Sequence, residues 1–556
     1  MDAIAPSLKT NKDALDQART KIDKNILLLE DQLRALKSER NTLAPVNFLP
    51  PDVLARIFRH LRDRWWIEAG YVPQRVKNAL VKWIWVTHVS KTWREIALGP
   101  GQPDLWTVIP TQNIPCYTAF LARSRQAGLF VEIDNKSWTW KVGPVLEQYR
   151  RIRQFKHKGN VSDDVRGYLG FPAPQLESFS FHPESAYSPN LPDNLFANST
   201  PRLRHVYIQD CAFNWNLGIF HNNLVTLSIV TPISTTTIKV VVDLLATMPK
   251  LETLALHHVL QKDEQGRVNK TAARAVDLPF LTKLEIHTDT FRQLLSLLSR
   301  FTVSGQAEMN LHYKAASDTP FFDAFSVIQR SRKETSFNDI QAVQLSQDSF
   351  TAYTQDRPTG TPVFSLHCEP KVVEPAGIGK WLPKALELFS DNLESFSAID
   401  VPITEKMWVR LEKPLWRVGH IKTVGSPGTA LIAFLTNDYD NNCPQNARDE
   451  GEDGDGHCCD MAGGYKEEDW EDIAYENVAS LEMTKMVYPD EEEHERVLYM
   501  FYHRNKFERG FSTVSFTACP NLSRDQAYEL GLHVDKVHFE EAENDDEEEW
   551  YGHACV

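Results

Sequence analysis

The stretch LETLAL at residues 251–256 shows the pattern from which the fold of this chain is predicted. Its three leucines, Leu251, Leu254 and Leu256, are separated first by two residues and then by one. The same spacing of apolar residues occurs in LESFSF (176–181), LRHVYI (203–208), LVTLSI (224–229) and LTKLEI (281–286). The five starts lie 27, 21, 27 and 30 residues apart. Because side chains alternate between the faces of a strand, each copy predicts one short strand with a buried face.

The segments between the copies are long enough to return the chain through a helix or an irregular turn. Residues 240–246 and 291–298 are apolar over helical length. Fainter copies begin further along the chain, at Ile340, Leu393, Val478 and Phe511. One strand and one return at this spacing resembles a leucine-rich repeat. The resemblance implies an α/β fold in which residues 111–437 and 471–539 stack as an irregular solenoid; an unrelated α/β fold with chance motifs is the alternative.

In such an array the variable positions of each strand lie opposite its buried positions. These positions predict a surface that binds a protein substrate, of unknown identity. Its candidate residues are His205, Tyr207, Thr253, His257, Lys283, Glu285 and His287. The alternative is that each of them is an ordinary solvated strand residue.

A second informative stretch is LPPDVLARIFRHL at residues 49–61. Its prolines suit a helix start, and its apolar residues form the stripe of one short helix. Residues 89–97 (VSKTWREIA) and 103–106 (PDLW) add a second apolar stripe and an aromatic end. Helices this small and this rich in Trp, Ile and Phe either dock another protein or pack on the rest of the chain.

These three pieces, in this order, resemble an F-box domain of the F-box-like form common in fungi. Ser90 stands where the family usually has cysteine, and residues 63–77 form a longer link, which predicts a loop. The resemblance implies a small all-α domain at residues 45–110 that docks on the Skp adaptor, and through it on the cullin, of a ubiquitin ligase. Carried over by position, the adaptor-binding residues are Leu49, Pro50, Leu54, Ile57, Phe58, Val89 and Trp93.

The first 44 residues carry a heptad pattern. Its apolar positions are Leu15, Ile22, Leu29, Leu36 and Leu43, with Ile26 and Leu33 between them. The spacing predicts a helix that ends before Pro45. It is either a coiled-coil arm that forms a homodimer or a single amphipathic helix packed on the body.

Acidic side chains are concentrated at the C-terminal end. The net charge is −15, and residues 438–556 hold 9 basic and 32 acidic side chains. Residues 438–470 therefore predict a disordered acidic insertion, and residues 540–556 a solvated acidic tail. An acidic surface repels phosphate, so we expect no nucleic-acid partner. Without an apolar leader or span, we also expect no membrane partner and a cytoplasmic or nuclear location.

Signatures of enzymes, cofactors and metal sites are missing from the sequence. There is no Gly-x-Ser-x-Gly, phosphate-binding glycine loop or His-Glu-x-x-His. We therefore expect no catalytic residue, no cofactor and no metal site. The favoured function is the substrate-recognition subunit of a Skp–cullin–F-box ubiquitin ligase. The alternatives are a binding scaffold of the same architecture without ligase output, and an enzyme without a recognisable motif.

Overall fold

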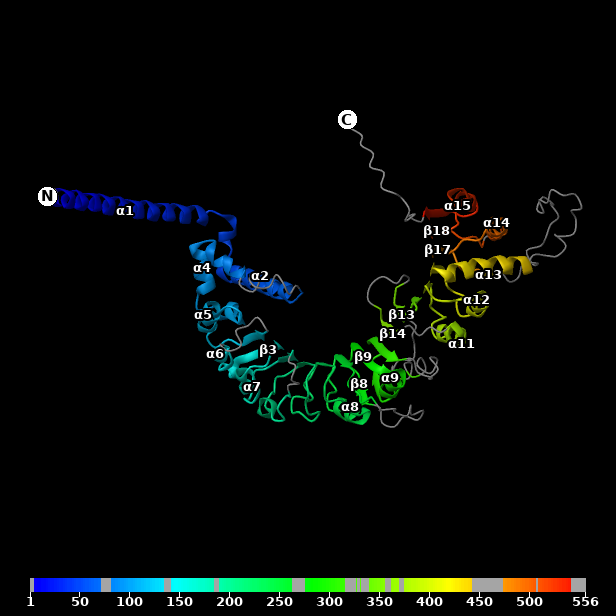
Figure 1. Ribbon diagram of the computed structural model, residues 1–556, viewed down its shortest axis with the longest axis horizontal. Coiled ribbons are helices and arrows are strands. Elements are labelled where there is room, and N and C mark those ends of the chain that lie inside the picture. The colour runs from blue at the N-terminus through cyan, green and yellow to red at the C-terminus, as the bar shows by residue number, and fades with distance from the viewer. Residues whose placement is uncertain are drawn as a thin grey trace, which may run out of the picture. The chain divides into compact units, whose positions relative to one another are not determined.

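The protein has a mixed α/β fold in which a 17-stranded, mostly parallel sheet alternates with helices (Figure 1). The computed structural model describes residues 5–71, 82–134, 142–184, 190–262, 276–315, 327, 331, 340–355, 362–369, 375–442, 474–506 and 509–541. The chain divides into two compact units, residues 1–206 with 217–219, and residues 207–216 with 220–556.

In the first unit, the described elements up to residue 106 are all helices or 3-10 helices. Its helices and 3-10 helices are α1 (Ala5–Thr42), η1 (Pro45–Phe48), α2 (Pro51–Tyr71), η3 (Trp83–His88), α4 (Lys91–Leu98), η4 (Pro103–Trp106), α5 (Ile114–Ser124), α6 (Gly143–Leu146), η6 (Tyr149–Arg151), α7 (Asp163–Leu169) and η7 (Leu195–Asn198). Its strands β1 (Val108–Ile109), β2 (Leu129–Ile133), β3 (Ile152–Gly159) and β4 (Ser178–Pro183) pair in chain order and in parallel.

The helices of this unit differ from the prediction in one place. The helix predicted before Pro45 is confirmed as α1, which ends at Thr42. The loop predicted at residues 63–77 is wrong as far as Tyr71, because α2 continues to that residue. The stretch holds no proline before residue 73, and its glycine, Gly70, lies in the last turn of the helix. The helix-breaking residues therefore come too late in the sequence to prevent a helix from residue 63 to residue 71. Residues 72–77 lie outside the described residues.

The second unit is built from strands with helices between them. Strand β5 (His205–Gln209) contains the division between the units. The strands that follow are β6 (Thr226–Val230), β7 (Thr253–His257), β8 (Val276–Leu278), β9 (Lys283–Thr290), β10 (Phe301–Val303), β11 (Glu308–Ala315), β12 (Ala342–Leu345), β13 (Ser349–Tyr353), β14 (Phe364–Cys368), β15 (Ser395–Ile399), β16 (His420–Val424), β17 (Ser480–Thr484), β18 (Thr513–Thr517) and β19 (Lys536–Glu540). The helices are α8 (Ile238–Leu245), α9 (Phe291–Leu298), α11 (Pro375–Leu386), α12 (Glu405–Leu411), α13 (Ser426–Asn442), α14 (Glu491–Lys506) and α15 (Arg524–Gly531).

Each clear copy of the sequence pattern contributes one strand. The first leucine of every copy stands just before its strand and is fully buried: Leu176, Leu203, Leu224, Leu251 and Leu281. The other two apolar residues lie within the strand and are also buried. The helical segments predicted at 240–246 and 291–298 are confirmed as α8 and α9, and α9 packs against β9 and β11. The alternation of buried and exposed positions therefore fixes which side of each strand faces the core.

The parallel order is interrupted once in the second unit. Strand β11 pairs in parallel with β14, β14 pairs with β13 in the antiparallel direction, and so does β13 with β12. Parallel pairing resumes from β12 to β15 and continues through β19. The faint copy at Ile340 is thus the first strand of a hairpin. Only residues 346–348 connect β12 to β13, and a parallel crossover needs a much longer connection.

A turn of the same geometry follows strand after strand in this unit. Its first residue has a positive φ, between 44° and 76°, and its N–H donates to a backbone carbonyl of the next paired strand, at the last residue of that strand in six of the seven turns. The seven residues are Asp210, Thr231, His258, Asp400, Gly425, Lys485 and Ala518. Only one of them is glycine, although the left-handed region favours glycine. The turn keeps the ends of neighbouring strands at the same level.

The predicted acidic segments are covered only in part. Residues 438–442 belong to α13, so the prediction of disorder from residue 438 is wrong for this turn. Residues 443–470 of the insertion and 542–556 of the tail lie outside the described residues. None of the helices in the part of the chain that the structure covers combines the length and the apolar character needed to cross a bilayer.

Candidate functional site

The described helices between residues 45 and 106 share an apolar core, which continues into α5 through Phe120. Helix α2 buries Leu54, Ala55 and Phe58. Trp106 packs edge-to-face with Trp83 at 5.0 Å between ring centroids, and its indole N–H donates to the carbonyl of Ala97 at 2.9 Å. This packing holds α2, η3, α4 and η4 together.

Trp93, on α4, contacts residues of both η1 and α2. Its Nε1–H donates to Oδ1 of Asn47 at 2.6 Å, and its ring lies 5.2 Å from that of Phe58. Its backbone N–H donates at 3.2 Å to the hydroxyl of Ser90, the N-cap of α4. Trp93 is thus held from three sides and is only half-buried.

The predicted adaptor-binding residues fall into two groups by exposure. Leu54 and Phe58 are 1 % and 0 % exposed, so in this conformation they support the surface from below. The others reach solvent: Leu49 is 37 % exposed, Ile57 36 % and Val89 54 %, and Pro50 is exposed as well.

Sequence comparison with the F-box pattern missed several exposed apolar residues in the same elements, among them Phe48, Trp85 and Val53. Phe48 is 73 % exposed, Trp85 70 % and Val53 36 %. A helical spacing could have found Val53, because Val53 and Ile57 lie four residues apart on α2, beside the buried pair Leu54 and Phe58. We call the following set the apolar surface: Phe48, Leu49, Val53, Ile57, Trp85 and Val89. Its members lie on or beside η1, α2 and η3, and α2 contacts η3.

The predicted substrate-binding residues come together only in part. Thr253 pairs in register with Lys283, and His257 with His287, across β7 and β9. His205 and Tyr207 lie on β5, and the division between the units falls between them. The five residues on β7 and β9 are therefore the part of the prediction that forms one surface.

A row of four histidines crosses this face of the sheet. His257, His287, His312 and His367 occupy matching positions on β7, β9, β11 and β14. Their neighbouring ring centroids lie 3.7, 4.1 and 4.4 Å apart. We call these residues the histidine row. His312 and His367 were missed, although each histidine of the row directly follows a buried leucine or isoleucine in the sequence.

Glu285 joins two members of the row. Its Oε1 lies 3.0 Å from Nε2 of His257 and 3.2 Å from Nε2 of His287. The contact with His257, and then that with His287, holds the pKa of Glu285 well below its ordinary value. Glu285 is therefore ionised throughout the neutral range. A half-buried carboxylate between two imidazoles is able to attract a cation.

The remaining histidines of the row stay uncharged. Burial, together with the neighbouring His287 and His367, lowers the pKa of His312 to about 4. Burial also lowers the pKa of His367. Nε2 of His312 lies 3.0 Å from Oδ1 of Asn310, which in turn accepts a hydrogen bond from Ser365. His312 and His367 thus present neutral imidazoles at physiological pH.

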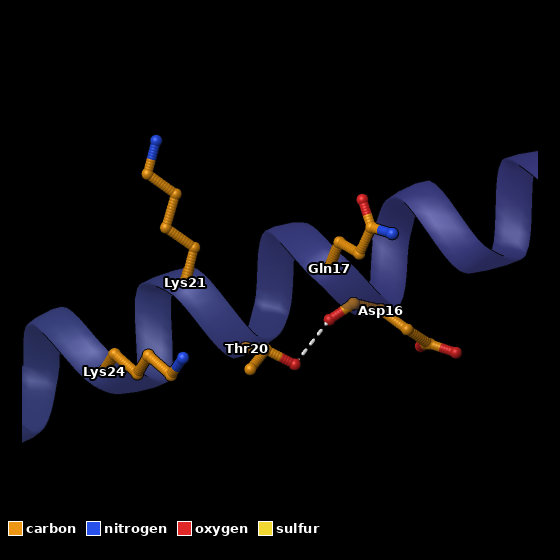
Figure 2. Close-up of a pocket in the computed structure, with 5 residues that line it drawn as sticks. All are labelled: Asp16, Gln17, Thr20, Lys21 and Lys24. Atoms are coloured by element: carbon orange, nitrogen blue, oxygen red, sulfur yellow. Dashed lines mark hydrogen bonds between the residues drawn. The ribbon is translucent and has the colours of Figure 1, made fainter.

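A shallow depression on α1 offers no comparable arrangement. It is lined by Asp16, Gln17, Thr20, Lys21 and Lys24, all from one helix (Figure 2). The hydroxyl of Thr20 donates within the helix, to the carbonyl of Asp16 at 2.8 Å. A lining from a single helix leaves one side open, so the site candidates remain the apolar surface and the histidine row with Glu285. No protein-family model matches this chain, and no curated protein matches its sequence.

Proposed function

We propose that this chain is the substrate-recognition subunit of a Skp–cullin–F-box type ubiquitin ligase. The observation that carries the proposal is that the F-box-like pieces, in the order of the family, fold as helices that bury some of their apolar side chains and leave the apolar surface exposed. Exposed aliphatic and aromatic groups of this density are typical of surfaces that lose water on docking. The apolar surface would bind the Skp-type adaptor and, through it, the cullin.

The strands and turns would form an irregular leucine-rich-repeat solenoid that holds the substrate. In support, each clear copy supplies one strand with a buried leucine before it, and the same left-handed turn recurs. The exposed positions of β7 and β9 would contact a protein substrate. The chain itself would catalyse nothing: it would raise the local concentration of substrate beside the ubiquitin-loaded enzyme, in the cytosol or nucleus.

Helix α1 would bind the same helix of a second copy of the chain and so form a homodimer. Its heptad residues are open to solvent: Leu29 is 63 % exposed and Leu36 64 %. A helix of 38 residues with an uncovered apolar seam is suited to a two-stranded coiled coil. A homodimer would place two substrate surfaces in one complex.

Co-purification tests the adaptor proposal. The full-length chain carrying Val89→Asp should fail to retain a Skp-type adaptor and cullin, because the carboxylate would lose water without gaining a partner. Val409→Asp is the matched control: Val409, on α12, is also 54 % exposed but lies in the second unit. Equal adaptor retention by the two variants would contradict the proposal. Adaptor bound without cullin would instead favour a binding scaffold without ligase output.

A further inference from the structure

Three side chains of the polar face bring metal-binding atoms together. Two nitrogens and one oxygen, from His257, His287 and Glu285, all lie within 4.8 Å of one another. The two measured separations from Glu285 Oε1 to the Nε2 atoms are 3.0 and 3.2 Å. Around a tetrahedral zinc ion, with ligands at about 2.0–2.1 Å, neighbouring ligand atoms lie about 3.3 Å apart. The separations in the protein are close to those of ligands that share one ion.

The two nitrogens both face the carboxylate of Glu285. Nε2 of His257 and Nε2 of His287 are shielded from solvent, and neither makes a hydrogen bond of normal geometry, although both contact the carboxylate. A buried polar atom left in this way costs free energy unless something satisfies it. A cation between the three atoms would satisfy both nitrogens and neutralise the charge of Glu285.

The backbone holds the three residues in place from both sides. Strands β7 and β9 pair in register, which sets His257 opposite His287 and Ala255 opposite Glu285. Just after β7, the N–H of His258 donates to the carbonyl of His287 at 2.8 Å. Nδ1 of His258 also lies 2.9 Å from Oδ1 of Asp289. The sheet thus fixes the backbone positions, and the two imidazoles, which stack nearly parallel at 3.7 Å, would rotate to turn their nitrogens toward one ion.

We propose that Nε2 of His257, Nε2 of His287 and Oε1 of Glu285 bind one divalent first-row transition-metal ion, with Zn²⁺ as the best-suited ion. Imidazole and carboxylate suit zinc, whereas Ca²⁺ and Mg²⁺ prefer oxygen ligands alone. Three protein ligands leave a fourth position open. The side chains are 17 %, 24 % and 27 % exposed for His257, His287 and Glu285, so water or a donor from another molecule reaches that position. The site does not depend on adaptor docking.

Metal titration of the full-length chain tests the site. After chelator treatment, the wild type should bind Zn²⁺ by calorimetry at a site that is lost, or weakened more than about 100-fold, in His287→Gln and in Glu285→Gln. His420→Gln is the matched control. Nε2 of His420 lies 3.8 Å from Oε2 of Glu482, but Lys422 forms an ion pair with that carboxylate and occupies the place of a cation. The control variant should bind Zn²⁺ like the wild type.

Two further measurements keep the result clear. Circular dichroism without metal checks that the variants are folded. If a glutamine variant is unfolded, Glu285→Asp replaces it, because aspartate keeps the charge on a shorter side chain. Glu285→Asp should stay folded and bind Zn²⁺ more weakly than the wild type. Co²⁺ titration of the wild type should give a tetrahedral spectrum without a thiolate charge-transfer band, because the site contains no sulfur. Unchanged Zn²⁺ affinity in the folded variants, or a thiolate band at the tight site, would overturn the proposal.

Discussion

Acid should destabilise this protein through His312, which lies between two other histidines. Its ring centroid is 4.1 Å from that of His287 and 4.4 Å from that of His367. Burial first, and then these neighbours, lower its pKa from 6.5 to about 4 in the folded chain. Below pH 6.5 the His312 imidazole therefore binds a proton in the unfolded chain, whereas in the folded chain it stays unprotonated until the pH approaches 4. Stability is lost as the pH falls from 6.5 towards 4 and does not change on this account above pH 7.

The size of the effect follows from these two pKa values. Between pH 7.5 and pH 5 the lost free energy of unfolding is about 2 kcal/mol for a complete shift, and about 1–2 kcal/mol after allowance for the partial exposure of the ring. Glu285 contributes little in this range, because its lowered pKa costs stability only below about pH 4.5. The comparison of His312 with a non-titrating side chain then isolates the imidazole.

Urea unfolding followed by far-ultraviolet circular dichroism measures the difference. Between pH 7.5 and pH 5 the free energy of unfolding should fall in both proteins. The fall in His312→Gln should be about 1–2 kcal/mol smaller than the fall in the wild type. Between pH 7.5 and pH 8.5 the two proteins should show the same pH dependence, which is the control. Parallel curves down to pH 5 would refute the reasoning about the histidine row.

Four other predictions concern the core, the two surfaces and α1. Val89→Ala should weaken adaptor binding by about 0.9 kcal/mol, or about fourfold, because it removes two carbon groups from a side chain that is 54 % exposed. The control Val409→Ala, at a residue with the same exposure, should leave adaptor binding unchanged. Calorimetry with purified adaptor measures both. Leu254→Ala, at a site that is 0 % exposed, should lower the free energy of unfolding by about 2–5 kcal/mol in urea. Lys283→Glu should reduce capture of substrate and leave the adaptor bound, and unchanged capture in pull-downs would remove β9 from the substrate surface. Removal of residues 1–44 should convert a species of twice 63.6 kDa into a monomer in sedimentation, whereas a monomeric intact chain would exclude the dimer.

The strands could be predicted because their sequence pattern reflects burial. The leucine that precedes each strand and the two apolar residues within it are all buried, so the pattern located β4, β5, β6, β7 and β9. The hairpin of β12 and β13 could not be found in this way. Antiparallel and parallel strands have the same alternation of side chains, and only the short connection separates the two cases.

The candidate site could be predicted only one strand at a time. Alternation placed His257, Glu285 and His287 opposite the core, but it says nothing about which strands pair or in what register. His367 joins the row because β14, not β12, lies beside β11. The buried positions of Leu54 and Phe58 were likewise not visible in the F-box pattern, which marks apolar residues without saying which of them face inward.

The recurring left-handed turn gives the second unit a direction of assembly. The N–H of Thr231 is bonded to the carbonyl of His257, and that of His258 to the carbonyl of His287. Each turn thus takes its partner from a strand that comes later in the chain. During synthesis on the ribosome, each of these turns is completed only when the following paired strand has emerged. A chain arrested before β9 would leave the amide of His258 and the imidazole of His257 without their partners.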